Sequence, residues 1–554
     1  MPTFAELRER IAMAPARVRV TTRVARTSGM MWGLRPAGLR VMAKSLLRER
    51  QSPSLIYRIH AANKPDATAL VWRDLRLTWR ELDDRLDRIA HALSRRGLAR
   101  GQSVLLMMRN RAEFLQMQAA CSRLGAPAVS VSWRSTASEL VYLANHCGAR
   151  FLVTEADLLP VVEKALPELP ALSLDRVVVA GERAKGTLAF DDLLAERAPR
   201  VDDDQADEDA AVVVYTSGTT GKPKGAVRKF PKDTFVAAMR FIAETPMRVD
   251  DVHLVTCPLY HSTAFGFVAL THLIGGTVVI MDEFKPDLFL EAVERHRVNT
   301  TAVVPTMLHR ILSLDPAILA RHDARTLRVV FSGGAPLPAP LAVDFMDRFG
   351  DVVFNFYGAT ETGLVTLAKP AHLRAAPATI GRAIEGNEIK LLDEGGREIG
   401  PGSVGELYVR NAMLVAGYHA DDHATRQSMK DGFFSVGDLA RRDAEGRYFI
   451  EGRKRDMIIS GGVNVYPAEV EGVLEHHPDV AEVAVVGVAD REWGERVRAF
   501  VVRKPGSSLD EGALKAWARE RLAGPKVPRD FRFVDGLPRN PTGKVLKREL
   551  REWE

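Results

Sequence analysis

The sequence predicts an α/β protein with a large N-terminal lobe of mostly parallel sheets flanked by helices and a small mobile α+β domain at the C-terminus. From about residue 65, short apolar runs alternate with amphipathic segments, which is typical of parallel strands covered on both faces by helices. After about residue 380 the runs alternate in polarity, as antiparallel strands do, and there we expect a small β-barrel-like part. A chain of 554 residues is also too long for a single hydrophobic core.

The elements of the large lobe can be assigned in chain order. Thr78 and Glu81 have the spacing of a capping box, apolar residues then repeat at helical spacing, and Gly97 is a suitable stop. A second helix is expected over residues 113–125. Strands are expected at the apolar runs 104–108, 128–132, 151–154, 176–180, 210–214, 252–256, 277–281, 301–305 and 328–334.

The C-terminal part has a different pattern. Residues 388–399 and 405–410 have the turns and alternation of antiparallel strands, and a polar break follows at 441–447. The last hundred residues again alternate helix and strand, with helices at 467–477 and 514–522 and strands at 482–488, 498–503 and 531–535. We therefore expect an N-terminal extension at 1–50, a large N-terminal domain at 51–453 and a hinged small domain at 454–554.

Composition is that of an ordinary soluble globular protein, with 46% hydrophobic and 27% charged residues. The three cysteines have no metal-ligand spacing and fit a reducing cytosol better than a disulfide framework. No apolar run reaches the ~18 residues that a membrane span requires, and the N-terminus lacks the features of a secretory signal. We expect a cytoplasmic protein.

The net charge of +6 is concentrated at the N-terminus. Residues 1–50 carry 11 Arg and Lys against 3 Glu, a local +8, which leaves the other 504 residues at −2. This arm mixes Arg with Met, Trp and Leu, so it either packs on its own globule or makes peripheral contact with the inner membrane surface. Nucleic acid is not an expected partner, because no zinc-finger spacing or RNA-binding signature accompanies the charge.

The stretch YTSGTTGKPKGAVR at 215–228 is predicted to leave a buried strand as an anion-binding loop. Backbone N–H groups of Ser217 to Gly221 can form a nest for phosphate oxygens. Lys222 and Lys224 can offset part of a triphosphate charge. The loop is not a Walker P-loop, because Pro223 follows the lysine where Ser or Thr would open a helix. The residues expected to contact phosphate are Thr216, Ser217, Gly218, Thr219, Thr220, Gly221, Lys222 and Lys224.

Together with six further motifs, this loop resembles the signature of the adenylate-forming enzymes, and the chain is most like a fatty-acyl-CoA synthetase. The further motifs are, in chain order, PLYHSTAF (258–265), FSGGAPL (331–337), NFYGATETG (355–363), SVGDL (435–439), EGRKRDMIISGGVNVYPAEVE (451–471) and PRNPTGKVLKREL (538–550). The resemblance spans roughly residues 55–550. It implies ATP, Mg²⁺ and coenzyme A as cofactor and co-substrates.

The resemblance also implies the function of individual residues. Lys544 is the catalytic lysine of adenylation, where a point cation can stabilise charge on the phosphoryl oxygens. Lys547 and Arg548, just after it, are expected to be surface charges. Catalysis is assigned to Lys544, Glu361, Thr216 and His261, with Glu361 and Thr216 holding magnesium. The nucleotide is contacted by Gly333, Gly334, Ala335, Pro336, Asn355, Phe356, Tyr357, Gly358, Ala359, Thr360, Asp438 and Arg453.

The remaining implied sites concern the acid, the hinge and the thiol. His261 lies beside the acyl carboxylate and Phe265 at the gate of an acyl tunnel, although a structural histidine and a core phenylalanine remain alternatives. The small domain turns at Arg455 and presents Ser460, Gly461 and Gly462 to the thiol channel. Two positions depart from the family pattern: Val436 stands where Thr is usual, and Arg455 where Asp or Lys is usual.

The sequence therefore predicts an ATP-dependent acyl-CoA synthetase acting on a medium- or long-chain fatty acid through an acyl-AMP intermediate. Alternatives that keep the adenylation step are an aryl-CoA ligase, an acyl-AMP ligase that loads a carrier protein, and a β-lactone-forming relative. A non-catalytic nucleotide- or acyl-binding protein held at a membrane by the arm is a remote alternative. A homodimer is left open.

Overall fold

The computed structural model describes residues 20, 22–29, 35–46, 53–195, 212–216, 224–228, 232–415, 417, 422–461, 463–540 and 544–553. The chain divides into two compact units. Unit 1 consists of Met1–Ala302, Asp315–Val329 and Ala412–Thr425, and unit 2 of Val303–Leu314, Val330–Asn411 and Arg426–Glu554.

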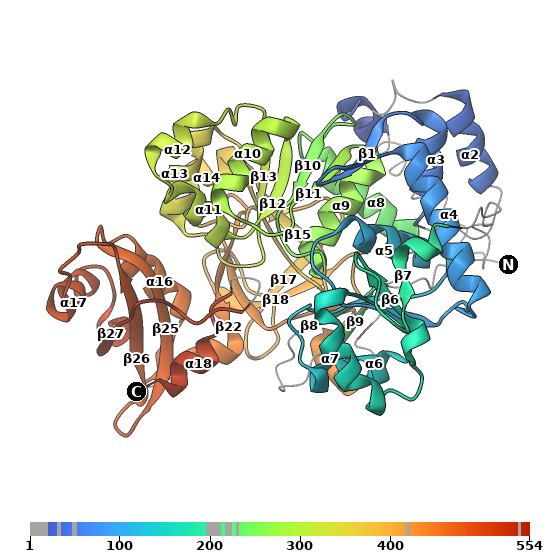
Figure 1. The fold of residues 1–554 in the computed structure, drawn as a ribbon. Helices are drawn as coiled ribbons and strands as arrows, with labels where there is room; N and C mark the ends of the chain where they lie inside the picture. Colours follow the sequence, from blue (N-terminus) through green and yellow to red (C-terminus); the bar gives the residue numbers. More distant parts are fainter. Residues whose placement is uncertain are drawn as a thin grey trace. The chain divides into compact units, whose positions relative to one another are not determined.

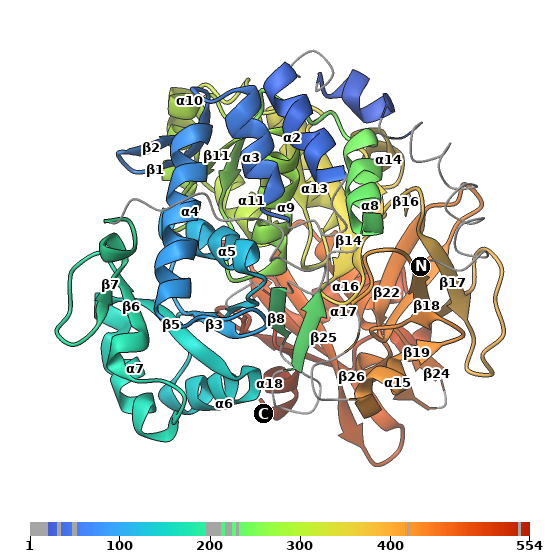
Figure 2. The same ribbon diagram turned by 90° about the vertical axis from the view of Figure 1, so that its right-hand side faces the viewer.

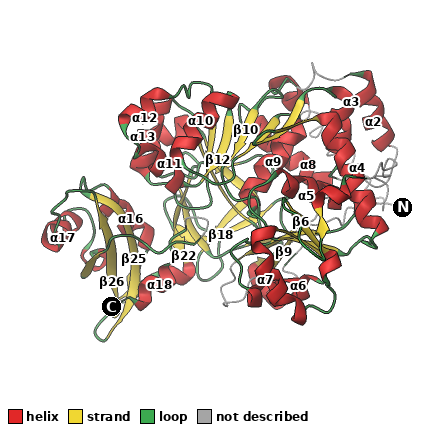
Figure 3. Cartoon of the chain, viewed as in Figure 1, coloured by secondary structure: helices red, strands yellow, loops and turns green. Residues whose placement is uncertain are grey.

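Unit 1 contains a seven-stranded sheet in the order β7-β6-β5-β3-β4-β8-β9. All neighbouring strands are parallel except β8 and β9, which are antiparallel. The alternation of helix and strand that produces this sheet is visible in Figures 1 and 3. The strands are β3 (Ser103–Leu106), β4 (Ala128–Ser130), β5 (Ala149–Glu155), β6 (Val177–Ala180), β7 (Leu188–Ala189), β8 (Val212–Thr216) and β9 (Lys224–Arg228).

A second sheet segment of unit 1 has the order β12-β10-β11-β1-β2 and is parallel except for the β1–β2 hairpin. Its strands are β1 (Thr68–Trp72), β2 (Leu75–Thr78), β10 (Val252–Val255), β11 (Thr277–Ile280) and β12 (Thr300–Val303). The helices of unit 1 are α2 (Pro36–Leu46), α3 (Leu55–Asn63), α4 (Trp79–Arg95), α5 (Ala112–Leu124), α6 (Ala137–Cys147), α7 (Leu159–Ala165), α8 (Lys232–Ala243), α9 (Ser262–Ile274), α10 (Pro286–His296) and α12 (Pro316–Arg321). The predicted parallel architecture of the large lobe is confirmed.

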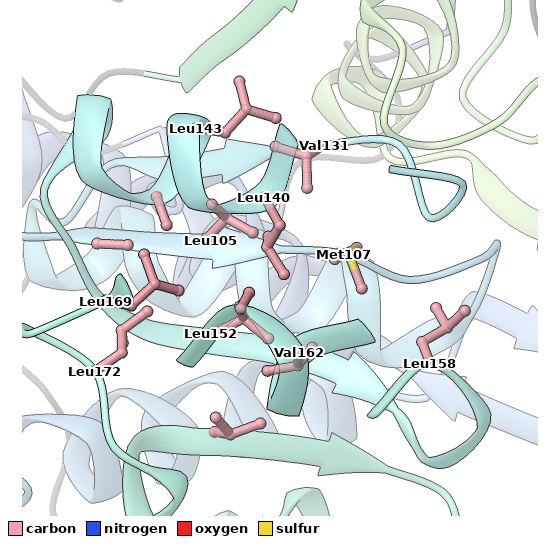
Figure 4. Close-up of a cluster of buried hydrophobic side chains, with 14 of the residues drawn as sticks. Leu105, Met107, Val131, Leu140, Leu143, Leu152, Leu158, Val162, Leu169 and Leu172 are labelled. Atoms are coloured by element: carbon pink, nitrogen blue, oxygen red, sulfur yellow. The ribbon is translucent and has the colours of Figure 1, made fainter. Parts of the chain in front are cut away.

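One face of the seven-stranded sheet is covered by α6 and α7. Leu140 of α6 and Val162 of α7 are fully buried against Leu105 and Leu152 of the central strands, as Figure 4 shows. Every side chain in this cluster is aliphatic or aromatic apart from methionine and cysteine, so burial of apolar area holds the two helices on the sheet.

The helices α3, α4 and α5 form a second layer in unit 1, with α3 and α4 side by side in Figure 2. The expected capping box at the start of α4 is present, with both the Thr78 and Glu81 side chains engaged. Inside the layer, Arg123 is fully buried and pairs with Asp83 and Asp87, and Asp87 also pairs with Arg58. Two arginines against two aspartates leave this buried network neutral, which is the condition for burying charge.

Unit 1 also buries a group of three histidines, His60, His253 and His272, which we call the buried histidine group. His272 contacts the Tyr57 hydroxyl through Nδ1 at 3.2 Å and the Trp79 ring at a centroid distance of 5.2 Å. Burial lowers the pKa of His60 to about 4 and the pKa values of the other two to about 3. All three are therefore neutral at pH 7.

The described parts of the N-terminal arm pack on unit 1. Val24 and Ser28 are buried, and the Ser28 carbonyl accepts a hydrogen bond from the Val249 amide at 3.0 Å. Gly38 of α2 lies so close to α3 that an added Cβ would come within 1.8 Å of Asn63 Oδ1. Of the two alternatives for the arm, packing on the folded body of the same chain therefore holds for these residues.

Unit 2 begins with a sheet segment in the order β16-β15-β14-β13, where β13 and β14 are parallel and the rest antiparallel. Six antiparallel strands follow in the region expected to be barrel-like, with the order β19-β20-β18-β21-β22 and β17 paired to β18. The strands are β13 (Val329–Ser332), β14 (Val353–Ala359), β15 (Gly363–Ala368), β16 (Arg382–Ala383), β17 (Glu388–Leu392), β18 (Val404–Arg410), β19 (Met429–Lys430), β20 (Phe433–Phe434), β21 (Asp438–Arg442) and β22 (Tyr448–Arg453).

The C-terminal part of unit 2 is the predicted small α+β fold. Its sheet has the order β24-β23-β26-β25, with β27 paired to β26. The strands are β23 (Ile458–Ser460), β24 (Val463–Val465), β25 (Val480–Asp490), β26 (Gly494–Arg503) and β27 (Asp530–Phe533). The helices of unit 2 are α11 (Pro305–Leu312), α13 (Ala339–Phe349), α14 (Pro370–Ala375), α16 (Pro467–Glu475), α17 (Glu511–Arg519) and α18 (Lys547–Glu552), and α15 (Asp422–Ser428) lies between β18 and β19.

This C-terminal part has its own hydrophobic core. Val470 and Leu474 of α16, Leu514 of α17 and the inner faces of β25 and β26 are completely or almost completely buried together. The domain boundary after Arg453 nevertheless stays a prediction, because unit 2 also contains residues from 303 to 411. Among the helices that the structure describes, none combines the length and the apolar character needed to cross a membrane.

Candidate functional site

Unit 2 brings together Tyr357, Asp438 and Arg453. The Tyr357 hydroxyl donates a hydrogen bond to Asp438 Oδ2 at 2.6 Å, and Arg453 Nε lies 3.0 Å from Oδ1. Asp438 and Arg453 are directly opposite each other in the β21–β22 pair, so strand register sets their contact. Burial, and then the Asp438 carboxylate, raise the pKa of Tyr357 well above 10. The phenol is therefore a proton donor at neutral pH, and each carboxylate oxygen keeps a further lone pair for a sugar hydroxyl.

The glycine-rich turn after β13 packs against an aromatic ring of the protein itself. An added Cβ at Gly333 would come within 2.4 Å of the Phe356 ring, and Gly334 has a φ of +78°. Without a side chain, Gly333 lets the backbone approach a flat ring closely, and in this structure that ring belongs to Phe356. Ala335 and Pro336 continue the turn.

The β14–β15 hairpin holds Glu361 at its tip. Gly358 admits no side chain, because an added Cβ would lie 1.9 Å from the Gly363 carbonyl oxygen. The Ala359 amide donates to Thr362 Oγ1 at 3.0 Å, which closes the turn that also contains Thr360. Glu361 is 8% exposed. A constrained carboxylate of this kind suits Mg²⁺, which commonly takes one or two protein carboxylates and completes its shell with water and phosphate oxygens.

Asn355 has a structural contact in β14. Its amide is buried and donates to the Thr379 carbonyl at 3.0 Å. This bond ties β14 to the segment before β16, so Asn355 shapes the strand that presents Tyr357. Its contact with a nucleotide stays a prediction.

Lys544 lies near Asp438 and Arg453, as the electrostatics of its amine show. Burial, and then the charge of Arg453, lower the pKa of Lys544 from 10.5 to about 8, while Asp438 opposes the shift and Arg455 adds to it. The lysine is thus a half-buried cation at neutral pH, near two residues predicted to contact the nucleotide. The structure unites residues that are about a hundred positions apart in the sequence.

The predicted hinge lies in a single 3₁₀ turn, Lys454–Asp456, with Arg455 at its centre. Lys454 pairs with Glu406 at 3.0 Å, and Asp456 pairs with Arg551 of α18 at 2.9 Å. Arg455 itself is half-buried, and burial followed by the nearby Arg453 lowers its pKa. The turn is therefore held on one side by the antiparallel sheet and on the other by the last helix.

The turn predicted to face the thiol follows β23. Ser460 is 1% exposed, and Gly461 has a φ of +58° with Trp493 so close that an added Cβ would come within 2.5 Å of its ring. Arg529 stacks on the Trp493 ring, with a guanidinium-to-centroid distance of 4.0 Å. Sequence reasoning missed Trp493, because it lies 32 residues from Gly461 and in no motif. Gly462 lies outside the described residues.

The predicted phosphate loop of unit 1 joins β8 to β9. These strands pair antiparallel with Thr216 opposite Lys224, so Lys224 is the first residue of a returning strand. This agrees with the distinction from a Walker P-loop. The residues Ser217, Gly218, Thr219, Thr220, Gly221 and Lys222, and the side chains of Thr216 and Lys224, lie outside the described part.

His261 is the N-cap residue of α9 in unit 1. Its ring centroid lies 4.2 Å from that of Tyr260, and burial lowers its pKa to about 4. The imidazole is therefore neutral at pH 7. Its Nε2 has no hydrogen-bond partner among the described residues. Phe265 lies one turn along the helix, and its amide donates to the His261 carbonyl.

Comparisons with known proteins agree with the motifs. Residues 57–419 match the family model "AMP-binding enzyme", and residues 469–544 match "AMP-binding enzyme C-terminal domain". A feruloyl-CoA synthase from an Amycolatopsis species is 36% identical over 494 residues, covering 89% of this chain and 96% of the relative. The fatty acid–[acyl-carrier-protein] ligase ScoC from Streptomyces coeruleorubidus is 34% identical over 505 residues, covering 89% and 94%.

Among solved structures, the anthranilate CoA ligase AuaEII in complex with anthranoyl-AMP superposes with a TM-score of 0.84 at 27% identity, covering 92% of this chain and 98% of that one. The α/β architecture with a small C-terminal part is therefore confirmed. ATP, Mg²⁺ and coenzyme A, expected from the motifs, are the cofactor set of this family. The chain belongs to the family of AMP-binding enzymes and is an AMP-forming acid–CoA ligase, as its motifs predicted.

Proposed function

We propose that the chain activates a carboxylic acid in two half-reactions and that Lys544 serves the first. In this step an acid oxygen bonds to the α-phosphorus of ATP, the bond to the β-phosphate oxygen breaks, and pyrophosphate leaves. In the second step the sulfur of coenzyme A bonds to the acyl carbon, AMP leaves and the thiol proton is released. The observation that carries the proposal is that the Lys544 amine is near enough to Asp438 and Arg453 for their charges to change its pKa.

Asp438, Arg453 and Tyr357 act as the nucleotide-orienting set in this proposal. Asp438 accepts from the ribose hydroxyls while Tyr357 and Arg453 hold its carboxylate in place. Positioning of this kind converts a bimolecular attack into a unimolecular one. Bound magnesium would offset phosphate charge, and Glu361 with Thr216 would hold it.

We further propose that the acid is a medium- or long-chain fatty acid lying along α9. An added Cβ at Gly266 would meet no atom within 4 Å, so the helix faces open space next to Phe265. Seven of the other eleven residues of α9 are apolar, which suits an alkyl chain. The relative ScoC, which acts on a fatty acid, supports this substrate, whereas the feruloyl-CoA synthase favours an aromatic acid.

The neutral state of His261 limits what it can do for the acid. An uncharged imidazole orients a carboxylate by a hydrogen bond from its N–H and does not attract it by charge. Replacing His261 with Gln should therefore keep most adenylation activity, while Ala should raise the KM for the acid.

For the arm, we propose that its outward cations contact an anionic membrane surface while the enzyme stays in the cytoplasm. Arg23, Arg26, Arg40 and Lys44 are exposed on the helices that pack on unit 1. A variant in which all four residues are replaced by Glu should bind phosphatidylserine vesicles less well than the parent protein. Its adenylation activity should be unchanged. Equal vesicle binding by both proteins would contradict the proposal.

The central experiment is an acid panel assayed for pyrophosphate release with and without coenzyme A, and with Lys544→Ala as the control. We expect pyrophosphate release that depends on the acid and is lost in the variant, which should still convert supplied acyl-AMP to the thioester. If ferulic-type acids react faster than fatty acids, the proposed substrate is wrong and the enzyme activates an aryl acid. Transfer to a carrier protein without coenzyme A would identify an acyl-AMP ligase.

A further inference from the structure

The segment that carries Lys544 is a short hairpin with its own set of restraints. The Leu546 amide donates to the Pro538 carbonyl at 2.8 Å, and Arg539 and Val545 form an isolated antiparallel bridge. Asn540 closes the turn, since its amide donates to the Lys544 carbonyl and its Oδ1 accepts from the Lys544 amide, both at 2.9 Å. These bonds set the backbone of Lys544.

Each leg of this hairpin ends in an ion pair with the body of the C-terminal part. On the first leg, an Arg539 guanidinium nitrogen lies 2.7 Å from Glu482 Oε2 of β25. On the second, Lys547 Nζ lies 2.6 Å from Glu471 Oε1 of α16. The prediction that Lys547 is a surface charge is wrong, because its side chain is 21% exposed and paired. Arg548, the next residue, is exposed as expected.

Glu471 is itself held in place. The same Oε1 accepts a hydrogen bond from the Val485 amide at 2.7 Å, so the carboxylate links α16, β25 and the hairpin. Val545 and Leu537 pack beside the hairpin against the buried Val486 and Phe500. Two ion pairs on half-buried, hydrogen-bonded carboxylates are stronger than free surface pairs, whose typical contribution is about 0–1 kcal/mol.

A further titratable group facing this region is Glu475, one turn after Glu471 on α16. Burial, and then the charge of Glu471, raise its pKa to about 8, while Lys547 lowers it. Glu475 is therefore largely protonated at pH 7. Each of the two ion pairs joins one carboxylate, Glu471 or Glu482, to one cation, so the charges within each pair are balanced.

We propose that Lys547 and Arg539 are positioning residues for adenylation, which hold the hairpin so that the Lys544 amine stays within reach of Asp438 and Arg453. The inference rests on the proposed function of Lys544. It assigns to Lys547 and Arg539 an effect on the first half-reaction only, because in that proposal the thiol step does not use Lys544. Misplacement of a reacting group by about 1 Å can cost about 100-fold in rate.

The test uses full-length Lys547→Met and Arg539→Met, with Arg548→Met as the matched control from the same helix and Lys544→Ala in the same series. We expect a fall of about 10- to 100-fold in kcat for pyrophosphate release in the first two variants, with KM for ATP and acid within about twofold. Conversion of supplied acyl-AMP to the thioester should stay within about twofold. Arg548→Met should match the parent protein.

Two further variants separate positioning from general stability. Lys547→Arg keeps the charge and should recover at least half of the lost kcat. Lys547→Met combined with Glu471→Gln should be no slower than Lys547→Met alone, because both remove the same pair. If Lys547→Met slows both half-reactions equally, or leaves adenylation unchanged while Lys544→Ala abolishes it, the inference is overturned. If Lys544→Ala itself retains pyrophosphate release, it is the proposed function that fails.

Discussion

The lowered pKa of Lys544 predicts an unusual pH dependence for adenylation. A lysine is cationic below its pKa, and only the cation can stabilise charge on the phosphoryl oxygens. With a pKa of about 8, roughly 90% of the enzyme carries the charge at pH 7 and roughly 10% at pH 9. An unperturbed lysine would still be almost fully charged at pH 9. We therefore expect kcat/KM for ATP to fall about ninefold between pH 7 and pH 9.

The assay is pyrophosphate release without coenzyme A, measured across pH 6.5 to 10. The fall in rate at alkaline pH should be seen in kcat/KM, which reports the free enzyme. In kcat the same fall should occur at higher pH, because the bound triphosphate favours the charged amine. Lys544→Arg, which stays charged at every pH tested, should be slower but flat up to pH 10. Arg455→Met should move this fall to higher pH, because the Arg455 charge lowers the pKa of Lys544. A parent profile that stays flat to pH 9.5 would refute the reasoning.

Three other outcomes follow from the described contacts. Tyr357→Phe removes the hydrogen bond to Asp438, and we expect KM for ATP to rise about tenfold, the equivalent of ~1.4 kcal/mol for a bond to a charged group; an unchanged KM would show that Arg453 alone orients the carboxylate. Gly358→Ala places a Cβ 1.9 Å from the Gly363 carbonyl oxygen, so the turn that carries Glu361 must shift. The magnesium concentration for half-maximal adenylation should therefore rise severalfold. A magnesium titration equal to that of the parent protein would show that this turn does not bind the metal. The buried histidine group, whose folded pKa values lie below the unfolded value of 6.5, stabilises the fold fully above pH 6.5 and loses that contribution as pH falls toward 4. At pH 5 the loss should be about 2 kcal/mol for each histidine, visible as a lower urea midpoint than at pH 7, and equal midpoints would contradict the neutral assignment.

Local patterns predicted most of the fold. The capping box at Thr78 depends on residues three positions apart, and the structure contains it. Each apolar run predicted as a strand between residues 104 and 334 contains one, because a short continuous apolar run needs burial on both faces and a parallel sheet provides it. The polarity change after residue 380 likewise marked the antiparallel sheet. These are interactions between near neighbours or with an unspecified apolar surrounding, so the sequence contains the necessary information.

The partners of charged and aromatic side chains were not predictable in this way. Lys547 looked like a surface charge because its helix is short and polar, yet Glu471, 76 positions earlier, pairs with it. Trp493 has no motif, and only the folded sheet brings it against Gly461. The Phe356 ring packs against the backbone of Gly333, where any side chain would clash with it. In each case the contact depends on how segments that are distant in the sequence pack together in the folded chain.

By itself, the sequence determined the family, the order of the elements and the identity of the chemical groups, because these follow from residue type and short spacing. Only the tertiary structure decided the states of those groups. Burial beside Arg453 lowers the pKa of Lys544, burial alone keeps His261 neutral, and burial followed by the Asp438 charge raises the pKa of Tyr357. A charge state depends on desolvation and on charges brought near through space, and neither quantity exists until the chain has folded.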